Sequence, residues 1–483
     1  MIHKIVEILN CGRFVNYRPS EKEYGWNGVF SAKNTIYAEN GSGKTTFTQI
    51  LKSLSGKCCS LVEKRKSLQT KLPVSISVVN GDNHKLSYNI DKWNAHLLNI
   101  EVYDNYYVEN NVYIISFGSQ ESLSSLYDLL PDGYTIMAEI QKCKHKRKYT
   151  SGVIRNIRRE LKLVNDTQKI KNLKNKYNYY LEKKLQISNK IQELEQNLNK
   201  KILDFEKVYI EKVNIYLKKF NPSLEITKAN KRGQQLVYYI SINNIAVRSD
   251  SSNISLKHTL SEGDKSSLSL SFFLARLDLL PNIEKRIIVF DDPISSFDTR
   301  RRMMTISILS RIANKASQFF LLSHDINFVK EFCDRNPDST NLKIVWRDGS
   351  SVFVKHDINI ETMTGISKDI YTLQNYLKIG AINDFEKREV IRCIRPVIEG
   401  IFRFKYLNEC TDKEWLGNFL EHIKNCDKDS PLYRLNDYYD ELSDINDYCK
   451  QYHHSNPKYM EEPIFDEELR QFVNKTLNIL AYI

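Results

Sequence analysis

The amino-acid sequence predicts an α/β fold that is interrupted by an antiparallel helical hairpin and followed by an all-helical region. Short apolar runs of strand length occur before residue 138 and again after residue 221. Between them, apolar residues recur at intervals of three and four, as in an amphipathic helix. Beyond residue 360 only helical patterns follow. We therefore expect two halves of one α/β domain, an inserted hairpin and a C-terminal helical domain, with the boundaries 1–137, 138–221, 222–360 and 361–483.

Length and composition agree with a cytoplasmic protein of two or three domains. The chain has 483 residues, of which 41% are hydrophobic, enough for sizeable cores. Its apolar runs are far shorter than the roughly 20 residues that a membrane-crossing helix needs, and the N-terminal residues lack a signal-peptide pattern. None of the nine cysteines has C-x-x-C spacing, so we expect reduced thiols rather than a metal or redox site. No membrane partner is expected.

The α/β elements can be placed from the pattern of apolar residues. The first segment contains one strand–loop–helix unit, with the strand at 34–37, the loop at 38–45 and the helix at 45–54. Further strands are predicted at 74–79, 98–103, 224–227, 236–242, 286–290 and 318–322. The C-terminal helices are predicted at 370–377, 387–404, 415–423, 434–449 and 467–480.

The inserted segment is predicted to be a short antiparallel coiled coil. It has no proline, Gly152 is its only glycine, and Asn221-Pro222 ends it. The apolar residues from Ile191 to Val208 follow a partly heptad-like pattern. The tip of the hairpin lies either at 150–152 or at 165–167, and the pattern does not distinguish these two positions.

Positive charge is concentrated in this insertion. Between Lys142 and Lys219 there are 22 Lys and Arg against 8 Asp and Glu, a net charge of +14, whereas the whole chain carries +12. A local basic stripe predicts a polyanionic partner such as nucleic acid. The alternative is an ordinary solvated face of a coiled coil.

The loop at 38–45 has the spacing of a phosphate-binding P-loop, with Ala38 in place of the usual first glycine. It follows a predicted strand and opens a helix, so its backbone N–H groups would cradle the phosphates of ATP or another nucleoside triphosphate. Lys44 would reach the terminal phosphates, and the Thr45 hydroxyl would bind Mg²⁺. The predicted nucleotide-binding residues here are Asn40, Gly41, Ser42, Gly43, Lys44, Thr45 and Thr46.

A second acidic motif follows the apolar strand at 286–290. Asp291 would hold Mg²⁺ at the mouth of the strand, and Asp292 would act as general base toward the attacking water. A strand that ends in two aspartates is a weak signal alone and becomes a strong one beside a P-loop.

Three further motifs resemble those of ABC-type ATPases. Leu260–Lys265, with the sequence LSEGDK, resembles the signature motif, Pro293–Asp298 resembles the D-loop, and Leu321–Asp325 resembles the switch strand with His324 as its catalytic histidine. The resemblance implies that Ser261 and Gly263 contact nucleotide held by another subunit, in a homodimer or higher oligomer. The signature alone could also be a serine-capped helix.

The wording of these motifs is similar to the SMC/RecN-type branch, in which a coiled coil splits the head. The zinc hook of some relatives is missing, and no Q-loop glutamine is evident in Glu101–Tyr113. Asp292 stands where the family usually has glutamate. This implies slow turnover, suited to switching rather than to transport.

The C-terminal helical domain carries a candidate second site. Arg395 and Glu399 are spaced i and i+4 on one predicted helix, although Pro396 could kink it, and His453 and His454 lie farther along. Together they could cleave a phosphodiester in RNA. The simpler alternative is a salt bridge with a capping histidine pair.

The tail sequences RPVIEGIFRF and YHHSNP resemble antiphage ATPases of the PtuA type, found in Septu and some retron systems, and also the Arg–Glu–His triad of PrrC and RloC anticodon nucleases. This implies an ATPase that senses invasion and gates a toxic nuclease, which in PtuA-like systems is an HNH partner. Two alternatives remain: a self-contained tRNA anticodon nuclease and a RecN-like DNA repair ATPase.

Overall fold

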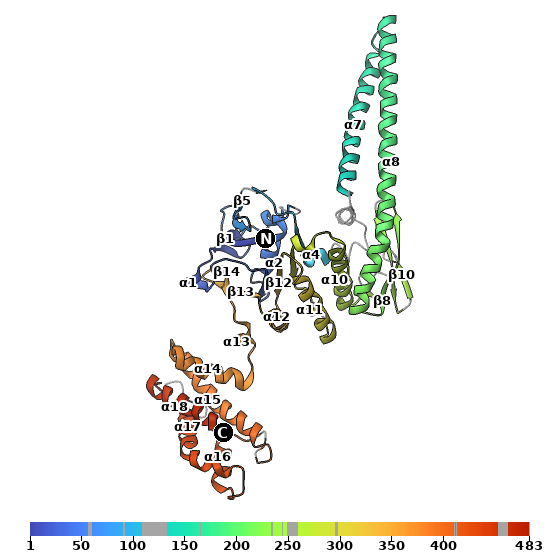
Figure 1. Cartoon of the computed structure of the whole chain (residues 1–483). Helices are drawn as coiled ribbons and strands as arrows, with labels where there is room; N and C mark the ends of the chain where they lie inside the picture. The colour runs from blue at the N-terminus through green and yellow to red at the C-terminus, as the bar shows by residue number, and fades with distance from the viewer. Residues whose placement is uncertain are drawn as a thin grey trace. The chain divides into compact units, whose positions relative to one another are not determined.

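The computed structural model describes the whole chain except residues 57–59, 90–91, 109–132, 165, 233–234, 244, 249–258, 295–297, 410, 412, 453–461 and 483. It divides into two compact units, Met1–His356 and Asp357–Ile483. The predicted fold class is confirmed, with a mixed α/β head, a long helical hairpin and a helical second unit (Figure 1). Among the described helices, none combines the length and the apolar composition that crossing a membrane requires.

A six-stranded sheet in the order β14-β13-β3-β12-β11-β7 forms the centre of the first unit. The strands are β3 (Lys33–Ala38), β7 (Ile100–Tyr103), β11 (Ile287–Asp291), β12 (Gln318–Ser323), β13 (Thr340–Arg347) and β14 (Ser350–Lys355). All neighbours are parallel except β13 and β14. Since β3, β12 and β11 are adjacent and parallel, the loops that follow them meet at one edge of the sheet.

Both faces of this sheet are buried, because the side chains of its central strands alternate between two cores. Ile287 and Val289 of β11 enter one core, whereas Ile288 and Phe290 enter the other. This explains why these strands read as continuous apolar runs in the sequence.

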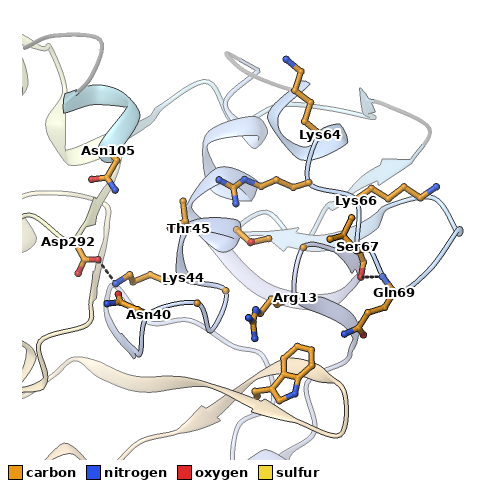
Figure 2. Close-up of a pocket in the computed structure, with 17 residues that line it drawn as sticks. Arg13, Asn40, Lys44, Thr45, Lys64, Lys66, Ser67, Gln69, Asn105 and Asp292 are labelled. Carbon is orange, nitrogen blue, oxygen red and sulfur yellow. Dashed lines mark hydrogen bonds and ion pairs between the residues drawn. The ribbon is translucent and has the colours of Figure 1, made fainter. Parts of the chain in front are cut away.

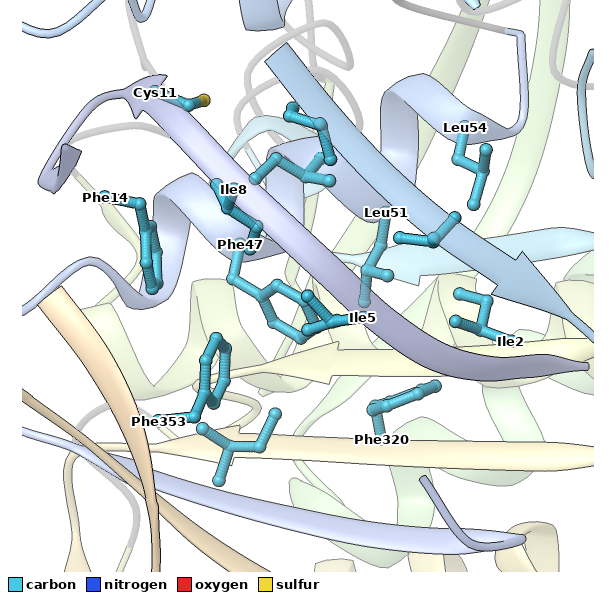
Figure 3. Packing of buried hydrophobic residues seen from close by; sticks show 14 of the residues in the cluster. Ile2, Ile5, Ile8, Cys11, Phe14, Phe47, Leu51, Leu54, Phe320 and Phe353 are labelled. Atoms are coloured by element: carbon cyan, nitrogen blue, oxygen red, sulfur yellow. The ribbon is translucent and has the colours of Figure 1, made fainter. Parts of the chain in front are cut away.

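The first core packs the six-stranded sheet against helix α2 and a second, five-stranded antiparallel sheet (Figure 3). Helix α2 spans Lys44–Leu54 and contributes Phe47 and Leu51, which lie near Ile5 of β1 and Phe320 of β12. The second sheet, in the order β2-β1-β4-β5-β6, consists of β1 (Ile2–Cys11), β2 (Phe14–Tyr17), β4 (Ser75–Asn80), β5 (Lys85–Asn89) and β6 (Lys92–Trp93). Short helices α1 (Glu21–Tyr24) and α3 (Ser60–Glu63) complete this part.

The opposite face of the six-stranded sheet is covered by helices. These are α10 (Glu262–Leu279), α11 (Thr299–Ala313) and α12 (Ile326–Arg335), with the short α4 (Asn105–Val108) and a 3₁₀ turn at Ile283–Lys285. The end of α8 belongs to the same core, because Tyr209, Val213 and Leu217 are buried in it. A three-stranded sheet, β10-β9-β8, follows the hairpin and consists of β8 (Leu224–Arg232), β9 (Gln235–Ile242) and β10 (Ile245–Arg248).

Two long helices, α7 (Gly133–Glu160) and α8 (Thr167–Phe220), lie side by side as an antiparallel hairpin (Figure 1). Helix α7 runs through Gly152 without a break and ends at Glu160, so the turn lies between Glu160 and Thr167, which excludes the first predicted position and overlaps the second. Asp166 caps α8, since its side chain accepts hydrogen bonds from the N–H groups of Gln168 and Lys169.

The second unit is an all-helical domain with its own core. Its helices are α13 (Ile358–Thr362), α14 (Gly365–Ile379), α15 (Asp384–Lys405), α16 (Leu416–Asn425), α17 (Tyr439–Gln451) and α18 (Asp466–Tyr482), with a 3₁₀ helix at Tyr433–Tyr438. Pro396 does not divide α15, which continues through it for nine further residues. The predicted helix at 434–449 is instead a 3₁₀ segment followed by α17.

Candidate nucleotide site and a second pocket

The loop between β3 and α2 is held in the conformation of an anion-binding nest. Gly43 precedes the first turn of α2 with a φ of +114°, and a Cβ there would come within 3.1 Å of the Phe14 ring. Only glycine fits this position without strain. Ser42 does not line the pocket; its Oγ donates to the carbonyl of Glu39 at 2.7 Å, and its own carbonyl accepts from Ser351 Oγ at 2.5 Å. The loop is therefore fixed in place by its neighbours.

Lys44, Asp292 and His324 form one connected group at the edge of the sheet. The Lys44 ammonium forms an ion pair with one carboxylate oxygen of Asp292. The other oxygen, Oδ1, accepts a hydrogen bond from the main-chain N–H of His324 at 3.0 Å and lies 2.8 Å from His324 Nδ1. Asp292 has a φ of +49°, in the left-handed region that non-glycine residues seldom adopt. A phosphate that reached Lys44 would compete with Asp292 for the ammonium.

Asp291 and Thr45 are suited to holding a divalent cation. Asp291 is buried, and its Oδ1 has no hydrogen-bond partner within the described parts of the chain. Burial, together with the neighbouring Asp292, raises the pKa of Asp291 to about 7, against the opposing effect of Lys44. A divalent cation would supply the missing partner and favour the charged carboxylate, and hard oxygen ligands of this kind suit Mg²⁺. Thr45, which lines the pocket, would provide the hydroxyl ligand.

These residues open onto a pocket of about 750 Å³ (Figure 2). Among the predicted residues, Asn40, Gly41, Gly43, Lys44, Thr45, Thr46 and Asp292 line it. Several other lining residues were missed by sequence reasoning, namely Gly12, Arg13, Lys64, Arg65, Lys66, Ser67, Leu68, Gln69, Asn105 and Trp346. The guanidinium of Arg13 lies 5.2 Å from the centre of the Trp346 ring, so a flat, cationic surface borders the phosphate loop.

Asn105 could have been found from the sequence. It follows β7, whose parallel pairing with β11 brings the two strand ends together beside the P-loop. It lies within Glu101–Tyr113, the segment in which ABC-type ATPases would have the Q-loop glutamine, and an asparagine can supply the same amide group. Arg13 and Trp346 belong to no motif, because Arg13 reaches the pocket from the turn between β1 and β2, whereas Trp346 reaches it from β13 of the other sheet.

The signature segment begins α10 through a reciprocal capping box. Ser261 Oγ accepts from the N–H of Asp264, and the Asp264 carboxylate accepts from the N–H of Ser261, both at 3.2 Å. The other Asp264 oxygen accepts from Asn221 Nδ2 at 2.6 Å, which ties the signature to the end of α8. Neither Ser261 nor Gly263 is among the described residues that line the P-loop pocket.

Comparison with known proteins identifies a family for this chain. Residues 137–434 match the model of the AAA_13 family, described as an AAA domain. The chain belongs to the AAA_13 family. This family match supports an ATPase.

An uncharacterized chromosomal cassette SCCmec type IVc protein, CR006, of Staphylococcus aureus (strain MRSA252) is 28% identical over 173 residues. The match covers 33% of this chain and 24% of that protein, so the chain matches about a quarter of the relative's length. Among solved structures, an Smc head domain with an extended coiled coil from Pyrococcus furiosus has a TM-score of 0.46 at 14% identity and covers 74% of this chain and 96% of its own. The recombination mediator RecF with ATP has a TM-score of 0.42 at 14% identity, with 74% and 99% covered.

The second unit contains a separate pocket of about 920 Å³ beside Arg395 and Glu399. Arg395 Nη2 lies 3.1 Å from Glu399 Oε1, which also accepts from the main-chain N–H of Leu416 at 2.9 Å. Glu399 is 2% exposed, and the guanidinium of Arg403 lies 3.9 Å from its second oxygen. The buried carboxylate is thus held by several donors. The predicted His453 and His454 lie outside the described residues.

Proposed function

We propose that this ATPase is the switching subunit of a prokaryotic antiphage system, in which ATP-dependent pairing of heads gates a toxic nuclease. The observation that carries the switching role is the Lys44–Asp292–His324 group, in which one carboxylate connects the phosphate-binding lysine to the switch histidine. The antiphage setting is supported by the likeness of the C-terminal segment to PtuA-type ATPases.

In this proposal the residues of the pocket have distinct roles. Lys44 and the loop N–H groups bind the phosphates, while Thr45 and Asp291 hold Mg²⁺. The bound metal would neutralise charge on the transferred phosphoryl group. Asp292 orients the attacking water, and His324 holds the Asp292 carboxylate through two contacts to Oδ1. The short aspartate side chain favours slow hydrolysis, which suits a switch.

Head pairing is part of the proposal because the signature lies away from the chain's own pocket. Ser261 and Gly263 would cover nucleotide that is bound to the P-loop of a second copy. The capping box engages the N–H groups of Ser261 and Asp264, while Ser261 and Glu262 are exposed at the start of α10, where a phosphate could approach the helix N-terminus. The proposal therefore includes a homodimer or a higher oligomer that forms through the heads.

The partner side of the proposal assigns nuclease activity to a separate subunit, and nucleic-acid binding to the basic hairpin. The direct experiment is to express the chain with its genomic neighbours, identify the co-purifying protein and measure phage protection. Protection that needs both proteins and an intact Lys44 would support gating. If no neighbour co-purifies and deletion of the neighbours leaves protection unchanged, the partner model fails.

A second candidate function is intrinsic RNA cleavage by the second unit. The pocket beside Arg395 and Glu399 favours it, because arginines line a cavity large enough for a nucleotide. One observation argues against RNA cleavage: Glu399 already accepts hydrogen bonds from Arg395 and from the main-chain N–H of Leu416, which suits a structural role. RNase assays on the purified chain distinguish the two. Hydrolysis stimulated by DNA, without toxicity or protection, would instead point to a RecN-like repair role.

A further inference from the structure

The positive charge of the hairpin is confined to the end that lies away from the head core. Between Lys142 and Lys190, across the turn, there are 16 Lys and Arg against 3 Asp and Glu. Between residues 191 and 219, toward the head, there are 6 against 5. The distal part therefore carries +13 of the +14, and the proximal part is close to neutral. We call residues 142–190 the distal hairpin.

Interhelical contacts define where this distal hairpin begins. Lys144 pairs with Glu195 at 2.9 Å, and Lys190 pairs with Glu139 at 2.6 Å. From this level to the turn, α7 extends for roughly 16 residues, about 25 Å at 1.5 Å per residue. This length matches several nucleotides of an extended strand.

Beyond that level the cations are exposed, except for the half-buried Arg147 and Lys184, and they lack acidic partners among the described residues. No ion pair with a carboxylate involves the lysines and arginines from Lys146 to Lys184 within the described parts of the hairpin. Arg158 instead donates to the hydroxyl of Tyr177 at 2.7 Å. Cations at this density that lack acidic partners repel one another and thereby destabilise the hairpin. A polyanionic ligand would offset this repulsion.

Two tyrosines stand out from this basic surface. The Tyr149 side chain is 73% exposed and that of Tyr179 is 59% exposed. Tyr179 meets Tyr180 edge-on and lies under the Lys183 ammonium, which is 5.5 Å from the ring centre. Exposed aromatic rings among lysines are the pattern by which proteins stack unpaired bases while binding the phosphates.

The distribution of the lysines argues against a membrane surface. Lys142, Lys144, Lys146 and Lys148 are exposed at two-residue spacing, so successive side chains are turned by about 200° around α7. A helix that lies in a lipid interface has one basic face opposite one broad apolar face. Cations on several sides of the distal hairpin instead suit a flexible polyanion that wraps around it.

We infer that the distal hairpin is a binding site for single-stranded nucleic acid, with its lysines on the phosphates and with Tyr149 and Tyr179 as stacking platforms. This inference rests on the nucleic-acid binding in the proposed function and specifies its location and strand form. Recognition through phosphates and stacking is independent of sequence.

The test compares two charge-matched triple variants of the full chain. Lys171→Gln, Lys174→Gln and Lys176→Gln neutralise the distal hairpin, while Lys200→Gln, Lys207→Gln and Lys218→Gln remove the same charge from the proximal part of α8. Fluorescence anisotropy with a 30-nucleotide single strand is measured across a salt titration. We expect the distal triple to lose about tenfold in affinity and to reduce the salt slope by about 2, and the proximal triple to change little.

Tyr149→Ala and Tyr179→Ala test stacking, with Tyr149→Phe and Tyr179→Phe as matched controls that keep the ring. The alanine variants should weaken single-strand binding several-fold and leave duplex binding unchanged. Equal losses from both lysine triples, a preference for duplex, or tight binding to anionic phosphatidylserine vesicles instead would overturn the inference. Wild-type chain that binds no nucleic acid would also remove nucleic-acid binding from the proposed function, whereas binding that survives the distal triple overturns the inference alone.

Discussion

The hydroxyl of Tyr209 on α8 donates a buried hydrogen bond to the main-chain carbonyl of Phe272 on α10, with 2.9 Å between the two oxygens. The same hydroxyl lies beside Tyr107, which follows the strand next to β11. Helix α10 begins at the signature, and α8 reaches from the turn of the hairpin to the head core. Tyr209 thus connects the hairpin with the signature helix and with the short helix α4, which follows β7.

If nucleic acid on the hairpin changes hydrolysis at the head, Tyr209→Phe should weaken that effect while leaving basal hydrolysis within about twofold. The substitution removes a buried hydrogen bond worth about 0.5–1.5 kcal/mol and keeps the packed ring. Tyr216→Phe is the matched control, because Tyr216 donates to Asp278 of the same α10 helix at an exposed site. Stimulation equal to wild type in Tyr209→Phe would show that this contact does not transmit the signal.

Lys44→Ala should abolish ATP binding and hydrolysis, since it removes the ammonium directed at the terminal phosphates. It also leaves Asp292 without its ion-pair partner. Nucleotide binding and phosphate release are measured together with the melting temperature, so that loss of fold is separated from loss of the site. Normal turnover in a folded Lys44→Ala chain would remove the basis for assigning the pocket to nucleotide.

Asp292→Ala should trap an ATP-bound dimer, because it removes the group that orients water but keeps Lys44 and the loop. Gly263→Arg should prevent dimer formation, since Gly263 is buried at the start of α10 and an arginine there distorts the signature. Light scattering with and without ATP measures both effects. Hydrolysis per chain that is constant over a hundredfold dilution, in a strictly monomeric sample, would contradict head pairing.

Arg395→Ala should lower the stability of the second unit by about 1–3 kcal/mol, because Glu399 stays buried with fewer donors. Arg392→Ala is the control, since Arg392 lines the same pocket and pairs with Glu389 at the surface. Hydrolysis at the head should stay unchanged in both. Thermal unfolding, RNA cleavage and recovery of a partner protein are measured on each variant. Together they separate a nuclease role of Arg395, a docking role and a purely structural role.

Lost RNA cleavage in a folded Arg395→Ala chain would establish the intrinsic nuclease. A lost partner with no cleavage in the wild type would establish docking. Protection that falls only in proportion to the amount of folded protein would leave Arg395 a structural residue.

The sequence predicted the central strands and the P-loop helix within a few residues, because strands buried on both faces form unbroken apolar runs. It missed β1, β13 and β14. In β1 the buried residues recur at every third position instead of every second one, because register shifts interrupt its pairing with β4. The sequence did not distinguish the two predicted positions of the turn, because Gly152 suggested a break that α7 does not have. An added Cβ at Gly152 would meet no atom within 4 Å. A glycine in an exposed helix face is tolerated at modest cost, so it did not mark the turn.

Most of the motif residues that were predicted to bind nucleotide line one pocket, because the spacing of such motifs along the chain places them at one edge of the sheet. Arg13 and Trp346 could not be predicted, since they are 333 positions apart and become neighbours only through the fold. The Arg395–Glu399 contact followed from helical spacing, whereas the carboxylate's bond to the Leu416 N–H depends on how α16 packs on α15.

The continuity of α8 gives the molecule a mechanical property. A helix of 54 residues is about 80 Å long. Its last 12 residues, from Tyr209 to Phe220, are seated in the head and occupy about 18 Å of that length. If α8 pivots near Tyr209, it acts as a lever. The outer part, from Thr167 to Tyr209, is then about 3.5 times as long as the inner part that is seated in the head. A tilt that shifts the inner end by about 1 Å then sweeps the outer end through 3–4 Å, and a load applied at the outer end is multiplied by the same factor where α8 meets the signature helix.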